Sequence, residues 1–276
     1  MPLLTPITDG DEATFLAITA AKRGPRRTRL QNAWPAIRGR YQHYEVCSAN
    51  LETLTAANLT TRRADDCKHC YDVPTKPLDA LIRRVLEIVP ASGSTMCQYC
   101  LIGETDSVDH YAPKDLFPEF SVFPRNLVSS CSKCNRLKST KWLLNGVREV
   151  ASLYFDDLPT DKYLYVEIDC SSGTRAKVTF DLRRPASITR AMFNRIKTQF
   201  KALNLIERFN KAGAEFISEV ELSCRALRHN GKAAVKKHLK KVGDGYAGKF
   251  GANHMKALVC HELVDNDDFM TLAGVY

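Results

Sequence analysis

Apolar residues recur at helical spacing in two regions of the chain. Between 78 and 89 they stand three or four residues apart, and Pro77 and Pro90 flank the run. Proline is common in the first turn of a helix, and a proline after a helix stops it. This pattern therefore predicts a helix over 78–89. Further apolar stripes from Ser187 onward predict more helices: Ile188, Met192, Ile196, Phe200 and Leu203, then Phe216, Val220, Cys224 and Leu227.

Two other patterns complete the expected fold. Residues 162–168 and 177–182 read as strands around Ser171-Ser172-Gly173, which predicts a β-hairpin. Residues 97–145 have weak periodicity and many cysteines, which is typical of a small module held by a metal ion. We therefore expect an α+β fold, a mainly helical chain around a small metal-held module. Its expected parts are a mostly helical 1–90 with a basic segment, the module at 91–145, and 146–276 with the hairpin and basic helices.

Composition and charge narrow the class of protein. The chain has 276 residues, 44% of them hydrophobic, and a net charge of +9. The positive charge is clustered, because 187–250 has 14 basic and 5 acidic residues and 22–40 has seven basic and none acidic. Each cluster is either a solvated face or a phosphate-contacting surface. In the first cluster, the nearby Trp34 and Tyr41 would suit contact with nucleic acid. No apolar run approaches the ~20 residues of a membrane span and the N-terminus does not read as a signal peptide, so we expect a cytoplasmic protein without membrane partners.

Four of the ten cysteines form two CxxC pairs, Cys97 with Cys100 and Cys131 with Cys134. Two intervening residues let both sulfurs of a pair reach one tetrahedral ion, so the two pairs predict a closed, structural zinc site. A redox role fits less well, because no strand–helix pattern of thioredoxin type surrounds them. A third pair, Cys67 and Cys70, leaves two alternatives: a second zinc site with Cys47, His43 or His69, or simple thiols.

The residues between and after the two pairs indicate chemistry. Asp109-His110, Asn126-Leu127 and Cys134-Asn135-Arg136-Leu137-Lys138 follow one another within about 45 residues. This order resembles the HNH endonuclease family, in the form with Asn at the third signature position. The resemblance covers about 97–142 and implies a ββα-metal fold held between two zinc knuckles.

The resemblance also implies a role for each matched residue. His110 would be the general base that takes a proton from the attacking water, a task that suits an imidazole with a pKa near ~6.5. Asp109 and Asn135 would bind a catalytic Mg²⁺ or Mn²⁺, since these ions prefer oxygen ligands. Asn126 would orient the histidine by hydrogen bonding. Three basic residues are expected to contact the nucleic acid: Lys138, Arg136 and Lys114.

These expectations describe a metal-dependent endonuclease that hydrolyses the phosphodiester bonds of DNA. Residues 117–124 replace the glycine-rich stretch of many HNH proteins, and this variant is similar to bacterial anti-phage nucleases of the Septu, retron and Zorya types. That similarity implies a role in defence, with other defence-system proteins as partners. The alternative is a zinc-stabilised, non-catalytic nucleic-acid-binding subunit of a larger complex. A binding knuckle does not need an Asp-His pair, which favours the enzyme.

A glycine pattern near the C-terminus invites a different interpretation. Gly243, Gly245 and Gly248 match GxGxxG, which in some folds binds nucleotides. Phe250 stands where a P-loop needs Ser or Thr, and no apolar strand precedes the glycines. We therefore expect a flexible loop between helices at this position.

Overall fold

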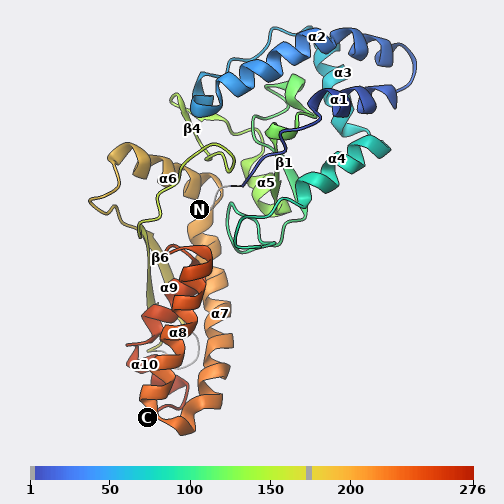
Figure 1. Cartoon of the computed structure of the whole chain (residues 1–276). Helices are drawn as coiled ribbons and strands as arrows, with labels where there is room; N and C mark the ends of the chain where they lie inside the picture. Colours follow the sequence, from blue (N-terminus) through green and yellow to red (C-terminus); the bar gives the residue numbers. More distant parts are fainter. Residues whose placement is uncertain (1–3, 172–175) are drawn as a thin grey trace. The chain divides into compact units, whose positions relative to one another are not determined.

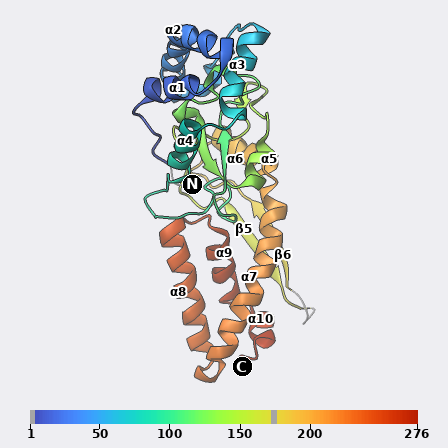
Figure 2. The same cartoon turned by 90° about the vertical axis from the view of Figure 1, so that its right-hand side faces the viewer.

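The computed structural model describes residues 4–171 and 176–276 (Figure 1 and Figure 2). Helices dominate, and the strands of this part of the chain form three separate two-stranded antiparallel sheets, which confirms the α+β class. The described residues divide into two compact units, 4–157 and 158–276. Within them no helix is both long and apolar enough to cross a bilayer.

The first unit begins with helices whose ends follow local signals. Thr60 and Thr75 each cap a helix by accepting a backbone N–H bond with the side-chain hydroxyl. The predicted helix at 78–89 is confirmed, but it starts two residues earlier and ends at Leu86, so Val89 lies outside it and is exposed. The helices are α1 (Asp11–Ala20), α2 (Gly24–Val46), η1 (Ser48–Thr53), α3 (Thr61–Asp72) and α4 (Lys76–Leu86).

The rest of the first unit contains the predicted ββα arrangement. Strands β1 (Ser107–His110) and β2 (Leu127–Ser130) pair antiparallel, and α5 (Ser132–Lys138) follows directly. The loop between the strands carries the short helices η2 (Pro118–Phe120) and η3 (Pro124–Asn126), and a small hairpin of β3 (Leu143–Leu144) and β4 (Val147–Arg148) comes after α5. Helix α4 packs against both β1 and β2.

An aromatic core joins α2 to the loop between β1 and β2. The rings of Tyr41 and Phe123 stack with centroids 4.0 Å apart, and Tyr44 meets the edges of Phe120 and Phe123. Buried aromatic rings contribute much apolar area, so this cluster ties the N-terminal helices to the ββα element within one core.

Four of the seven basic residues in segment 22–40 interact with other groups of the protein, and the first of them, Lys22, is buried and donates to backbone carbonyls. Arg26 and Arg29 both pair with the buried Asp66, and Arg40 pairs with the buried Glu119. Trp34 is buried and donates to Glu12, and Tyr41 belongs to the aromatic core, so neither ring is available for stacking on a base. These three arginines therefore stabilise the fold, because they pair with carboxylates that would otherwise be buried alone.

The second unit confirms the predicted hairpin and helices. Strands β5 (Leu164–Asp169) and β6 (Lys177–Leu182) pair antiparallel, while Ser172 and Gly173 of the predicted turn lie outside the described residues. Asn253 accepts backbone N–H bonds from Tyr163 and Leu164 and so holds the start of β5. The helices are α6 (Arg190–Ala202), α7 (Leu205–Leu227), η4 (Arg228–Asn230), α8 (Lys232–Phe250), α9 (Met255–Leu263) and α10 (Asp267–Leu272).

The loop predicted around the glycines is wrong, because α8 runs unbroken through Gly243, Gly245 and Gly248. Helices α7, α8 and α9 lie side by side (Figure 1 and Figure 2). A Cβ on Gly243 would stand 2.4 Å from Cδ2 of His261 and 3.2 Å from Cβ of Cys260, so this glycine lets α8 approach α9 closely. These glycines lie within a helix and therefore form no phosphate-binding loop.

Candidate active site and metal centre

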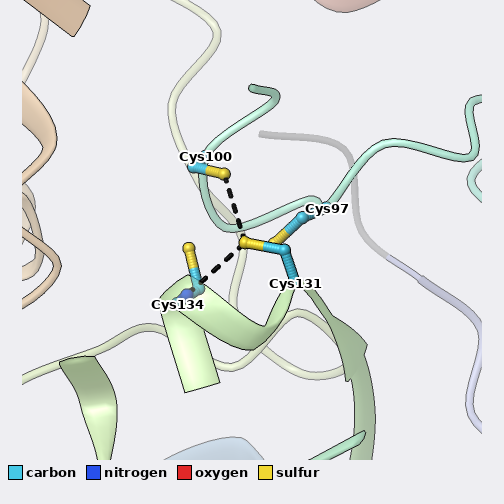
Figure 3. A group of neighbouring side chains, drawn as sticks. All are labelled: Cys97, Cys100, Cys131 and Cys134. Atoms are coloured by element: carbon cyan, nitrogen blue, oxygen red, sulfur yellow. Dashed lines mark hydrogen bonds between the residues drawn. The ribbon is translucent and has the colours of Figure 1, made fainter. Parts of the chain in front are cut away.

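Four cysteine side chains converge at the start of α5 (Figure 3). All four are buried, their sulfur atoms lie within 4.8 Å of one another, and the sulfurs of Cys100 and Cys131 are 3.9 Å apart. Four sulfurs about 2.3 Å from one zinc ion would be about 3.8 Å from each other in a tetrahedron. The cluster therefore fits a closed zinc site that leaves no position for substrate.

Local backbone geometry builds each half of this cluster. The backbone N–H of Cys97 donates to the carbonyl of Gly103 at 2.8 Å, which folds the first knuckle back on itself. A Cβ on Gly103 would come within 3.3 Å of both Cβ and Sγ of Cys131, so only glycine lets the two knuckles meet without displacement. Cys131 caps α5 and accepts the N–H of Cys134 with its sulfur at 3.4 Å.

The third CxxC pair does not form a second centre. Among the described residues, the four converging cysteines are the only group of three or more His, Cys, Asp or Glu side chains placed to share an ion. Cys67 and Cys70 are buried on α3, and Sγ of Cys70 donates to the carbonyl of Asp66. Burial raises the pKa of Cys70 to about 12, so this thiol keeps its proton at neutral pH.

Asp109 lies on β1 with its side chain enclosed. It is 2% exposed, accepts a hydrogen bond from the Tyr99 hydroxyl at 3.1 Å, and pairs with Nζ of Lys138 at 3.1 Å. Burial raises the pKa of Asp109 above its ordinary value, against the opposing effect of the Lys138 ammonium. A nearby cation stabilises the charged form of a buried carboxylate. The position of Asp109 therefore favours a cation beside it.

His110 is the last residue of β1, where the strand ends and the chain turns away. Its Nε2 lies 2.9 Å from the carbonyl oxygen of Ser121. A carbonyl only accepts, so Nε2 carries the hydrogen and Nδ1 keeps its lone pair. Burial lowers the pKa of His110 to about 4, which keeps the imidazole neutral at cellular pH. The ring of Tyr71 packs against it edge to face, with centroids 4.3 Å apart.

Asn126 is fully buried but does not hydrogen-bond to the His110 ring, contrary to the expectation. Its Oδ1 accepts the backbone N–H of Ala112 at 2.7 Å, and its Nδ2 donates to the carbonyls of Ala112 and Phe120. Asn126 thus joins the chain just after His110 to the chain just before Ser121, and orients the histidine only through the backbone.

Two side chains of helix α5 contact β1. Asn135 donates from Nδ2 to the Ser107 hydroxyl at 2.8 Å and to the Val108 carbonyl at 3.1 Å, which turns its Oδ1 away from these acceptors. One turn later, Lys138 is 1% exposed, and its Nζ donates to both Asp109 and the His110 carbonyl. Lys138 therefore faces the inside of the site, where protein groups engage its ammonium, whereas a contact with nucleic acid was expected.

The other two predicted contacts lie further out. Arg136 is exposed on α5. Lys114 is half-buried, pairs with Asp72, and has its Nζ 5.3 Å from the Tyr71 ring centre. Sequence reasoning missed Tyr99, Ser121 and Tyr71. Tyr99 stands inside the first CxxC pair and could have been noticed, but no local pattern marks Ser121 or Tyr71.

Comparisons with known proteins agree with this geometry. Residues 97–141 match the family model described as HNH endonuclease. The chain is also 29% identical over 170 residues to protein ea31 of Escherichia phage lambda, a match that covers 61% of this chain and 56% of that protein. No solved structure matches the chain significantly. Residues 97–141 are therefore an HNH endonuclease module of the zinc-knuckle form, a class of nuclease module that acts on nucleic acid.

Proposed function

We propose that this protein is a metal-dependent endonuclease that hydrolyses phosphodiester bonds of DNA. The observation that carries the proposal is the arrangement at the end of β1. There, a neutral His110 with a free Nδ1 lone pair follows an enclosed carboxylate, Asp109, and the zinc-held α5 packs Asn135 onto the same strand. A general base beside oxygen ligands is what phosphodiester hydrolysis requires.

In the proposed reaction, one residue transfers the proton and its neighbours hold it in position. Nδ1 of His110 accepts the proton of the attacking water, and the Ser121 carbonyl keeps Nε2 protonated so that the base acts through the other nitrogen. Lys138 holds the Asp109 carboxylate and the His110 carbonyl together, which fixes the turn at the end of β1. Asn126 secures the same turn from its other side.

The donor set fits Mg²⁺ or Mn²⁺. Asp109 offers carboxylate oxygens and Asn135 an amide oxygen, both hard ligands, and two protein ligands leave coordination positions for water and a phosphate oxygen. When bound, the ion would stabilise negative charge on the phosphate and the leaving oxygen. The amide orientation supports this assignment, since Nδ2 of Asn135 is already engaged with β1.

Exposed cations in the first unit are the proposed contacts for the DNA backbone. Arg136 follows the metal-binding Asn135 on α5. Arg62 and Arg63 are exposed at the start of α3 and line, with Arg29, a surface cavity of about 230 Å³. Backbone contacts of this kind supply affinity without sequence preference.

Cleavage of supercoiled plasmid tests the proposal. The full chain should nick or linearise plasmid with Mg²⁺ or Mn²⁺ and not with EDTA. The variant His110→Ala should keep fold, zinc and DNA binding but cut at least ~10²-fold more slowly, the scale of a general base. His229→Ala, an exposed histidine of the second unit, is the matched control and should cut normally. Wild-type cleavage by His110→Ala in a nuclease-free preparation would refute the mechanism.

One observation favours the non-catalytic alternative. Asp109 and His110 are only 2% and 8% exposed, and a lysine already occupies the carboxylate. A zinc-stabilised binding subunit would have such a closed site. The same assay separates the two functions, because a binding subunit would retain DNA without cutting it in any metal.

The defence role rests on the similarity to anti-phage nucleases described above. The curated relative is a phage protein whose name states no activity. We propose that the protein limits phage growth together with other defence proteins, and a plaque assay with wild type and His110→Ala tests this. Equal plaque counts for both, in cells where the wild type cuts DNA, would remove the defence role and leave the nuclease intact.

A further inference from the structure

A helix outside the HNH module reaches the proposed catalytic base. Tyr71, near the C-terminal end of α3, places its ring against the His110 imidazole with centroids 4.3 Å apart and planes at 74°. Tyr71 lies 26 residues before the first residue of the HNH module (97 − 71). The base is therefore in contact with a residue from the N-terminal helices, which belong to the same compact unit.

The end of α3 that carries Tyr71 is anchored by a buried lysine. Nζ of Lys22 donates to the carbonyls of His69, Cys70 and Val73 at 3.1, 3.3 and 2.8 Å. The His69 carbonyl also accepts the backbone N–H of Val73 at 3.3 Å. An ammonium among the last carbonyls of α3 helps to satisfy the helix end and stabilises its dipole. Lys22 is 5% exposed, which means that this cap is part of the core.

The Tyr71 ring is also held by a cation. Nζ of Lys114 lies 5.3 Å from the ring centre, within cation–π range, and pairs with Asp72, the next residue of α3. Lys114 comes four residues after His110 in the chain. Tyr71 is thus fixed between the loop that leaves the site and the histidine itself.

This contact adds a constraint to the hydrogen bond that holds the histidine at Nε2. The single hydrogen bond from Nε2 to Ser121 fixes one point of the imidazole but leaves the ring able to rotate about that bond. A rigid neighbour at the ring face stops this rotation, and the direction of Nδ1 is then set. A general base works only when its lone pair points at the proton it removes.

We infer that Tyr71 is a positioning residue, which holds the His110 ring so that Nδ1 faces the attacking water. The inference rests on the proposed endonuclease function and extends it, because the catalytic unit then includes α3. The ring and not the hydroxyl does the positioning, since the contact is an edge-to-face contact of the two rings.

Three variants of the full chain separate ring, hydroxyl and general effects. Tyr71→Ala should lower kcat about 3- to 10-fold, the range expected for loss of one aromatic contact, with little change in KM. Tyr71→Phe keeps the ring and should cut within about 2-fold of wild type. Tyr165→Ala is the matched control, because that ring also carries cations, Lys162 and Arg183, but belongs to the second unit. Equal losses in Tyr71→Phe and Tyr71→Ala would overturn the inference in favour of a hydroxyl that meets substrate.

A double-mutant cycle tests whether Tyr71 acts through His110. In a His110→Ala background, followed by its slow residual cleavage, adding Tyr71→Ala should cost nothing further. A full additional loss would mean that Tyr71 only supports the fold, and would overturn the inference. The proposed function is tested separately. If His110→Ala cleaves slowly and Tyr71→Ala cleaves at the wild-type rate, only the inference is rejected. If His110→Ala cleaves at the wild-type rate, the proposed function is rejected.

Discussion

The buried pair of Lys138 and Asp109 gives the most direct test of the site. In Lys138→Met the side chain keeps a similar length and fills the same space, but the carboxylate of Asp109 loses its cation. Both side chains are almost fully enclosed, at 1% and 2% exposure, so solvent cannot replace the lost partner. Removing one partner of such a pair typically costs about 3–5 kcal/mol of unfolding free energy.

That loss translates into a measurable melting shift. For a unit of this size each kcal/mol lowers Tm by about 2–4 °C, so the first unit of Lys138→Met should melt roughly 6–20 °C below wild type. Lys133→Met is the control, because Lys133 is exposed on the same helix and should shift Tm by less than about 2 °C.

The same variant should respond more strongly to a divalent ion. A ligand at 100 times its Kd stabilises by about 2.7 kcal/mol, and in Lys138→Met the ion meets an Asp109 carboxylate with no competing ammonium. Differential scanning calorimetry with and without Mn²⁺ should therefore recover more of Tm in Lys138→Met than it adds to wild type. The reasoning fails if the variant melts like wild type, or if Mn²⁺ raises both by the same amount.

Three further predictions address the zinc, helix α8 and the pH dependence of stability. Cys97→Ser should lose its zinc, seen by elemental analysis, and the β1–β2–α5 element should unfold, because the ion supplies much of its folding free energy. In denaturant melts Gly245→Ala should gain about 0.5–1 kcal/mol, since its Cβ meets open space in a helix, whereas Gly243→Ala should lose roughly 1 kcal/mol against His261. Burial lowers the pKa of His254 from 6.5 to about 4, so the unfolded state binds the extra proton first and stability should fall as pH drops from 6.5 to 4, by up to about 3 kcal/mol. His254→Phe should reduce that slope in pH-dependent denaturation and leave the part due to His110, whose pKa burial also lowers to about 4. An unchanged slope would assign none of it to His254.

The parts of the fold that were predictable are those with local causes. The helix over 78–89 follows from its own apolar spacing and flanking prolines, and the zinc cluster from the spacing of its cysteines. A pattern of this kind needs no knowledge of the rest of the chain. Helix α8 shows the limit, because the purpose of Gly243 depends on how closely α9 approaches it.

The parts that were missed depend on contacts between distant residues. Arg26 and Arg29 look like surface charge in the sequence, and only the fold brings the buried Asp66 to them from 40 and 37 positions away. Lys138 was expected to contact nucleic acid, because its helix position could not show that its ammonium pairs with Asp109 of β1. The contact of Tyr71 with His110 has no local signal either, since it depends on where α3 ends.

The short helix α5 carries residues of both predicted metal sites. A helix of seven residues is too short to be stable alone, and its first turn is fastened by the sulfurs of Cys131 and Cys134. The next residue, Asn135, belongs to the proposed catalytic site. An oxidant that joined these sulfurs in disulfides would expel the ion and loosen the helix, while the aromatic core around Tyr41 and Phe123 stayed packed. If the proposed function holds, cleavage would then stop in a protein that is still mostly folded, and the four sulfurs would make that activity sensitive to oxidation.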